Sequence, residues 1–146
     1  MIDNSSAEAP GTRSGALRLE LDERENGQSV TRVVAAPSLD DVVEALESLD
    51  QERHTELTVV DGSGAYITVG GGRGRYHVYM SAYDHDDRIV AQDPAAADRG
   101  ETQLIVDGRA TRYRARDVVD FEAATLAIRE FLRSGRPHSG LTWGTP

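Results

Sequence analysis

The sequence predicts an α+β fold: an antiparallel β-meander sheet with two helices packed on it. Short segments with alternating apolar residues recur along the chain, and Asn-Gly, Asp-Gly and Gly-rich turns separate them, which is typical of hairpins. Two segments show instead the three-to-four-residue apolar spacing of a helix. At 146 residues the chain fits one domain. We expect that domain over residues 16–146, after a disordered tail at 1–15 that is rich in Ser, Ala, Pro and Gly.

The first expected element is a hairpin. Leu17, Leu19 and Leu21 alternate with charged residues, as in a half-buried strand. The segment Glu25-Asn26-Gly27-Gln28 contains an Asn-Gly pair suited to a type I′ turn. Residues 30–35 would then return as the second strand.

A helix is expected next, with Ser38 as its cap. Asp40 and Asp41 would lie in the first turn, where the helix dipole favours negative charge. The apolar stripe of this helix comprises Leu39, Val42, Val43, Leu46 and Leu49. The acids expected to face away from the stripe are Glu44, Glu47 and Asp50.

A series of short strands is expected after the helix. The first lie at residues 57–60, 65–69, 76–82 and 88–91, and a further hairpin at 103–113 turns at Asp107-Gly108. A glycine run joins the second of these strands to the third. Its members Gly70, Gly71, Gly72 and Gly74 are interpreted as a structural turn, because glycine tolerates positive φ and close approach of another backbone.

The second helix begins after Asp120, which can cap it, and Glu122 lies in its first turn. Its buried stripe comprises Phe121, Ala124, Thr125, Ile128, Phe131 and Leu132. Gly135 stands where a left-handed residue ends a helix, and Pro137 prevents a restart. The tail that follows carries the single tryptophan, Trp143, and is expected to be held against the domain because burying an indole is favourable.

Composition limits the possible partners. The net charge is −9, with 25 acidic residues against 16 basic ones, and the basic residues are all arginine. Such a chain repels nucleic acid and anionic membranes and attracts a basic protein, although solubility alone would also account for the charge. The absence of cysteine suits a reducing compartment, and no apolar stretch has membrane-spanning length. We expect a cytoplasmic protein, a monomer when free or a small oligomer.

The strand after the glycine run carries the candidate binding residues. Tyr76, Val78, Met80 and Ala82 would form its core face, and the opposite face is polar and aromatic. On that face His77, Tyr79 and Tyr83 are candidate anchors for a protein partner. Asp84, Asp86 and Asp87 follow directly and would attract basic groups of the same partner.

Catalytic, cofactor and metal sites are not expected. A strand pattern rather than a helix follows the glycine run, which argues against a phosphate loop. Adjacent side chains in Asp84-His85-Asp86-Asp87 diverge, so a metal site there is not favoured. The four histidines are scattered, without a base–nucleophile set. The arginines Arg109, Arg112, Arg114 and Arg116 are expected to pair with the chain's own acids, with the last three on one strand face.

The second half of the chain resembles the Imm1-type immunity proteins of bacterial polymorphic toxin systems. The matching features are, in order, the segment 67–72, Arg75-Tyr76-His77-Val78, Asp93-Pro94, the segment 113–119, and Gly135-Arg136-Pro137 followed by Leu141-Thr142-Trp143. Together they span residues 57–143. The resemblance implies an α+β protein that neutralises a toxin, often a nucleic-acid deaminase, by binding it and without chemistry of its own.

The leading hypothesis is therefore an immunity protein that occludes the active site of a cognate deaminase-type toxin. One alternative is a small domain that binds a phosphate or nucleotide ligand, or acts as an enzyme, through the Gly70–Gly74 loop. Another is an interaction module for a different partner. The gene product encoded next to this one would separate these hypotheses.

Overall fold

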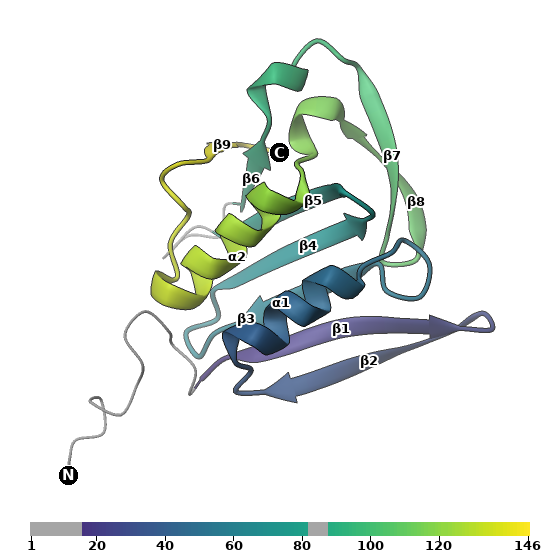
Figure 1. Ribbon diagram of the computed structural model, residues 1–146, viewed down its shortest axis with the longest axis vertical. Helices are drawn as coiled ribbons and strands as arrows, with labels where there is room; N and C mark the ends of the chain where they lie inside the picture. Colours follow the sequence, from purple (N-terminus) through teal and green to yellow (C-terminus); the bar gives the residue numbers. More distant parts are fainter. Residues whose placement is uncertain (1–15, 82–87) are drawn as a thin grey trace.

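The computed structural model describes residues 16–81 and 88–146, and it shows an α+β fold, as predicted (Figure 1). The predicted tail at 1–15 and the segment 82–87, with Tyr83, Asp84, Asp86 and Asp87, lie outside the described residues. The strands are β1 Arg18–Glu25, β2 Gln28–Ala35, β3 Glu56–Val60, β4 Tyr66–Gly72, β5 Arg75–Ser81, β6 Arg88–Gln92, β7 Glu101–Val106, β8 Arg109–Arg114 and β9 Thr142–Gly144. The helices are α1 Leu39–Ser48 and α2 Phe121–Ser134, with short 3₁₀ turns η2 Pro94–Ala96 and η3 Ala115–Asp117.

In the described part of the chain, seven strands form one antiparallel sheet in the order β2-β1-β3-β4-β5-β6-β9. Both helices lie on one face of it (Figure 1). We call the opposite face the outer face. The C-terminal tail is held as β9, where Ala91 of β6 pairs with Trp143, and the Trp143 indole N–H donates to the His138 carbonyl at 3.0 Å.

The predicted meander does not continue through β7 and β8, which among the described strands pair only with each other. This hairpin leaves the sheet and packs on it instead. Glycines in β4 make room for it: a Cβ on Gly70 would lie 2.6 Å from Val106, and one on Gly71 would lie 3.1 Å from Leu104. The hairpin thus covers one end of the outer face.

Three chain reversals use paired residues with positive φ. Asn26 and Gly27 have φ of 55° and 79°, and Asp107 and Gly108 have 52° and 75°, as type I′ turns require. The reversal between β4 and β5 uses Arg73 and Gly74, at 59° and 86°. Of the predicted turn glycines, Gly74 therefore lies in the turn, whereas residues 70–72 lie inside β4.

The helix ends follow from local capping. Ser38 and Asp41 form a capping box at the start of α1, Asp120 caps α2, and Gly135 ends α2 with a left-handed φ of 76°. One prediction was wrong: α1 ends at Ser48, so Asp50 is not on its outward side. The Asp50 carboxylate instead accepts hydrogen bonds from three consecutive backbone N–H groups, those of residues 52–54.

The core lies between the helices and the sheet. Its fully buried side chains include Val42 and Leu46 of α1, Ile128 and Phe131 of α2, and Ile67, Val69, Val78 and Met80 of the sheet. Their exclusion from water supplies most of the driving force for folding. Within residues 16–81 and 88–146, neither helix is long and apolar enough to cross a membrane.

Candidate functional site

Strand β5 divides its side chains as the sequence predicts. Tyr76, Val78 and Met80 are buried on the helix side. His77 and Tyr79 point to the outer face and are half-buried. Because the helices leave this face uncovered, its side chains are open to a partner wherever the β7–β8 hairpin does not cover them.

Four rings form a continuous row on the outer face, which we call the aromatic row: Tyr66, Tyr79, His77 and Tyr113. The rings of Tyr66 and Tyr79 meet edge to face, with centroids 6.2 Å apart and planes at 89°. His77 lies 5.7 Å from Tyr79 and stacks on Tyr113 at 4.1 Å with planes at 22°. The guanidinium carbon of Arg88 lies 5.1 Å from the centre of the Tyr79 ring, within reach of a cation–π interaction.

His77 is held neutral by its surroundings. Burial lowers its pKa to about 4, against an opposing effect of Asp117. Near pH 7 the imidazole is therefore uncharged and stacks as an aromatic ring under Tyr113. Its position beneath the β7–β8 hairpin suits it to orienting Tyr79 and Tyr113 more than to direct contact with a partner.

Glu56 is the most perturbed acid described. It lies on β3 in the same cross-strand row as Gly70 and His77. Burial raises its pKa to about 7, and the nearby carboxylates Asp107 and Asp22 add to the rise, while Arg24 opposes it. The Glu56 carboxyl is thus partly protonated near neutrality, and its charge also raises the pKa of Tyr113, whose burial is the larger cause.

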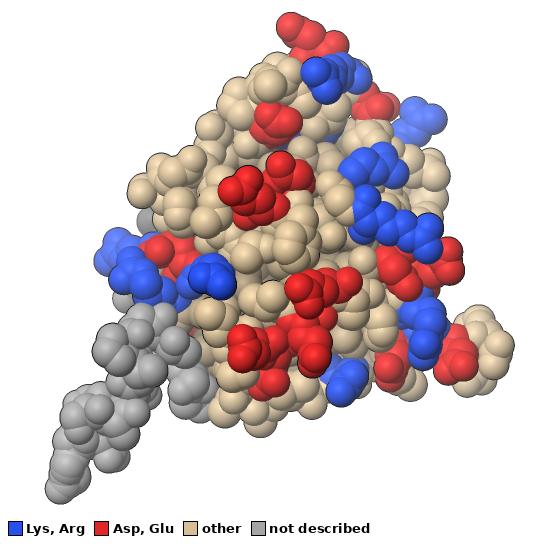
Figure 2. All heavy atoms as spheres, viewed as in Figure 1, with Lys and Arg blue, Asp and Glu red and all other residues tan. Residues whose placement is uncertain are grey.

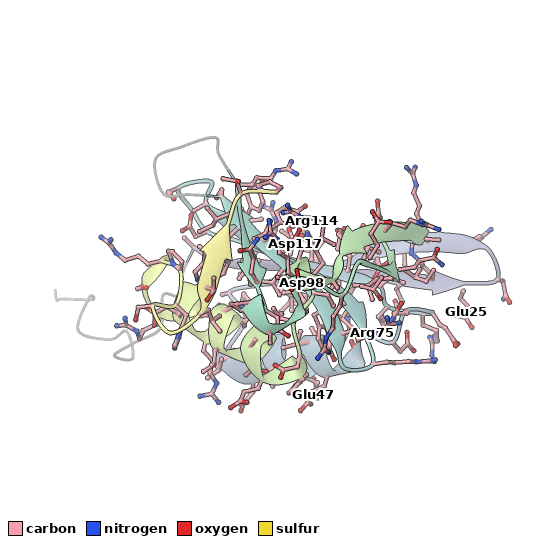
Figure 3. All side chains as sticks on the ribbon, turned by 90° about the horizontal axis from the view of Figure 1, so that it is seen from above. Glu25, Glu47, Arg75, Asp98, Arg114 and Asp117 are labelled. Carbon is pink, nitrogen blue, oxygen red and sulfur yellow. The ribbon has the colours of Figure 1, made fainter. Side chains whose placement is uncertain are left out.

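Two of the four arginines that were expected to pair with acids do so. Arg112 bonds to Glu101 at 3.3 Å and Arg114 to Asp117 at 2.8 Å, and Figure 3 shows the latter pair side by side. Arg116 was expected on the same strand face, but it lies in η3, after β8 has ended. These pairs leave less positive charge on the hairpin than the sequence alone suggests.

The helix side of the sheet carries a cluster of negative charge. Figure 2 shows acidic residues clustered over α1, with arginines toward the margins of the molecule. Asp40, Asp41, Glu44 and Glu47 of that helix are all exposed. Positions 84, 86 and 87, where the sequence predicts further partner contacts, lie outside the described residues.

The structure adds site residues that sequence reasoning missed: Tyr66, Arg88, Tyr113 and Glu56. Strand alternation could have found Tyr66, because Ile67 and Val69 already defined the buried side of that strand. The docking of the β7–β8 hairpin, which brings Tyr113 to His77, left no local pattern in the sequence.

The space beside Gly70, Gly71 and Gly72 is already filled, which leaves no room for a phosphate there. A Cβ on Gly72 would lie 2.5 Å from the Leu49 carbonyl oxygen, and Val106 and Leu104 fill the space beside Gly70 and Gly71. The chain continues into β5 rather than into a helix whose N-terminus could bind an anion. Among the described residues, no three His, Asp or Glu side chains gather as metal ligands.

Comparison with known proteins identifies the family. The model of the family "Immunity protein Imm1" matches residues 31–145 of the 146 residues, which includes the span 57–143 of the predicted resemblance. Searches of curated proteins and of solved structures found no match. Since the matched segment covers well over half of the sequence, the chain belongs to the Imm1 family of immunity proteins.

Proposed function

We propose that this protein neutralises a cognate nucleic-acid deaminase toxin by binding it and covering its active site. Membership of the Imm1 family carries the proposal, because it implies an immunity protein whose partner is a toxin. The deaminase class follows from the family resemblance in the sequence. The inhibitory mode, occlusion without chemistry, fits a protein whose described surface offers aromatic and acidic groups.

The aromatic row supports the outer face as the docking surface. Tyr79 and Tyr66 each keep part of the ring exposed on a rigid sheet, and their edge-to-face contact fixes their orientation. Half-exposed aromatic rings that are already ordered lose little entropy on binding and commonly carry most of an interface's binding energy. Tyr79 is the central anchor of the proposed interface, with His77 as its support.

Charge supports a basic partner. An enzyme that deaminates a nucleic acid must hold a polyanion, so its substrate cleft is expected to be basic. A protein of net charge −9 is attracted to such a cleft, and the attraction accelerates association. On sequence grounds, Asp84, Asp86 and Asp87 contribute to this steering, together with Tyr83 as a further aromatic contact.

The test is co-expression with the toxin domain encoded by the adjacent gene, each protein carrying a different affinity tag. We expect the two to co-purify as a stable complex. The purified protein should abolish deamination of a cytosine- or adenine-containing oligonucleotide by that toxin in a stoichiometric manner. A toxin that remains fully active with excess protein would overturn the proposal, and inhibition of a toxin of another chemistry would overturn its deaminase part.

A further inference from the structure

The edge strand β2 is open to solvent along its length. Among the described strands it forms one end of the sheet, beside β1 alone, and seven of its eight residues are exposed. Among the described residues, Val30 and Val33 are the exposed large hydrophobic side chains, at 60% and 55%. Edge strands are commonly protected from further pairing by lysine, proline or a bulge. The sequence of β2 has no lysine or proline and a single charged residue, Arg32, and its register with β1 continues unbroken over all eight residues.

The backbone of β2 carries free hydrogen-bonding groups on its outer side. Hydrogen-bonded pairs alternate along an antiparallel ladder. The N–H of Ala36 donates to the Leu17 carbonyl at 2.9 Å, so the even-numbered residues of β2 face β1. Ser29, Thr31 and Val33 therefore direct their N–H and C=O groups away from the sheet, where another strand can pair with them.

A groove of about 200 Å³ runs beside this edge, between β2 and α1. Leu19, Leu21 and Val34 supply its apolar lining. Asp41 and Glu44, which are one helical turn apart on α1, line the same groove, together with Arg32 and His54. One oxygen of Asp41 accepts the Ser38 N–H in the capping box. An apolar floor beside carboxylates suits a lysine or arginine, because the aliphatic stem can pack while the charged end meets the acids.

The charge around the edge selects the occupant. From β1 through α1, residues 18–48 contain eight acids and three arginines, and α1 itself contains no basic residue. Arg18 and Arg24 pair with neighbouring acids, which leaves Arg32 as the cation lining the groove. A second copy of this chain would bring the same negative field to the edge and be repelled, whereas a basic strand is attracted.

We propose that β2 binds an extended, basic segment of the toxin as an eighth strand of the sheet. A lysine or arginine of that segment enters the groove beside Asp41 and Glu44. Side chains alternate along a strand, so the neighbouring residues of the segment lie on the outer face, against Val33. This inference rests on the proposed function, because the partner is the toxin, and it adds a second contact surface to the aromatic row.

Hydrogen exchange of the wild-type complex gives the most direct test. The measurement uses NMR on isotope-labelled protein bound to unlabelled toxin. The amides of Ser29, Thr31 and Val33 should exchange at least about tenfold more slowly in the complex, because their outward N–H groups become hydrogen-bonded to the added strand or are shielded by it. The amides of Val30 and Arg32 already face β1 and should change less. This alternation would distinguish strand pairing from general burial.

Two pairs of variants test the same edge. Val33→Pro removes an outward N–H but no bond to β1, and should weaken toxin binding about tenfold or more. Val33→Thr keeps the N–H and the branched shape, and should bind within about threefold of wild type. Glu44→Gln should weaken binding about threefold with a smaller salt dependence, whereas Glu122→Gln, on α2 outside the groove, should leave binding unchanged.

The outcomes separate this inference from the proposed function. If the wild type inhibits the toxin but the odd-numbered amides show no added protection, the edge proposal is overturned and the immunity function stands. If the wild type does not bind the toxin, both fail. If the free protein dimerises through β2, as shown by sedimentation and by loss of the dimer in Val33→Pro, the occupant is a second copy and the basic-segment proposal is wrong. The exchange measurement needs no variant, so it decides even if Val33→Pro does not fold.

Discussion

The hydroxyl of Thr55 donates a hydrogen bond to the carboxylate of Asp22, and the same hydroxyl oxygen accepts one from the backbone N–H of Gly108 at 3.0 Å. Thr55 is fully buried, and its own backbone N–H also donates to Asp22. Burial would raise the pKa of Asp22, but hydrogen bonds from Thr55, Arg24 and the backbone hold it below its usual range. One threonine thus joins β1, the start of β3 and the β7–β8 turn.

We expect Thr55→Val to destabilise the protein by about 1–3 kcal/mol. The change removes one hydrogen bond to the buried Asp22 carboxylate, whose Oδ2 keeps the one from Arg24, and it leaves the Gly108 N–H without its partner. Lost hydrogen bonds to buried groups are costly. Denaturant unfolding gives the free energy, and amide exchange at Gly108 should accelerate first as the hairpin detaches. The control Thr142→Val replaces a threonine at an exposed position of β9, and should change stability by less than about 0.5 kcal/mol. Equal effects of the two variants would contradict a special role for Thr55.

Glu56 predicts a loss of stability as pH rises. Its pKa is raised to about 7 in the folded protein from an ordinary value of 4.5, so the folded state holds the proton more tightly than the unfolded state. Stability is therefore greatest, with respect to this group, below pH 4.5, and it falls as pH rises from 4.5 to about 7. Solvent screens part of this effect, and we expect a loss of about 1 kcal/mol.

Glu56→Gln should remove that slope and stabilise the protein at pH 8, where the wild type carries a poorly compensated carboxylate beside Asp22 and Asp107. Urea unfolding at a series of pH values measures it. Glu20→Gln, on the same outer face, is the control and should keep the wild-type slope. His77 acts in the opposite direction, because its lowered pKa removes stability as pH falls from 6.5 toward 4. The contribution of Glu56 is therefore the difference between the unfolding free energies of the variant and the wild type at each pH.

The strands, helices and caps were predictable because each leaves a local pattern. Ser38, Asp120 and Gly135 take the capping positions that their chemistry favours. The alternation of residues 76–80 gave the core face of β5 correctly. What the sequence could not show was non-local: that residues 101–114 leave the meander and pack over β4.

Only those residues of the candidate site that a local pattern marks could be predicted from the sequence. His77 and Tyr79 follow from strand alternation, but the partners that complete the aromatic row come from other strands. Glu56 has an ordinary sequence context, and its raised pKa results from burial and from Asp107 on the distant β7–β8 turn. Tertiary contacts, not residue type, make these groups unusual.

Tyr79→Ala should weaken toxin binding by about tenfold to a hundredfold. Truncating an ordered aromatic anchor commonly costs about 2 kcal/mol of binding free energy or somewhat more, which corresponds to a change in Kd of that size. Tyr79→Phe is the matched variant: it keeps the ring contacts with Tyr66 and Arg88 and should bind nearly as well as wild type. Titration calorimetry with the purified toxin domain measures both. If Tyr79→Ala binds normally while the β2 variants do not, the aromatic row is not part of the interface.

Replacing Asp84, Asp86 and Asp87 together with Asn tests the steering role assigned to them on sequence grounds. The association rate with the toxin should fall by about tenfold at low salt and lose much of its salt dependence, with a smaller change in dissociation. Stopped-flow mixing at several salt concentrations measures both rates. Replacing Glu52, Asp98 and Glu122, exposed acids outside the β2–α1 region, with Gln or Asn removes the same charge elsewhere. A similar loss in both variants would assign the steering to net charge rather than to residues 84–87.

The contact between Gly70 and Val106 predicts a coupled pair of substitutions. A Cβ on Gly70 would lie 2.6 Å from a Val106 methyl carbon, so Gly70→Ala should cost about 1–3 kcal/mol by forcing the hairpin away from β4. Val106→Ala alone should cost about 1 kcal/mol or more through lost burial. Because the shortened side chain at 106 makes room for the new methyl group, the double variant should be more stable than the sum of the two costs predicts, by at least about 0.5 kcal/mol. Gly74→Ala, paired with Val106→Ala, is the control cycle and should be additive, since a Cβ at Gly74 meets nothing within 4 Å. Additivity in both cycles would mean that the hairpin is not packed on β4 in solution, and then the stacking of Tyr113 on His77 would not hold either.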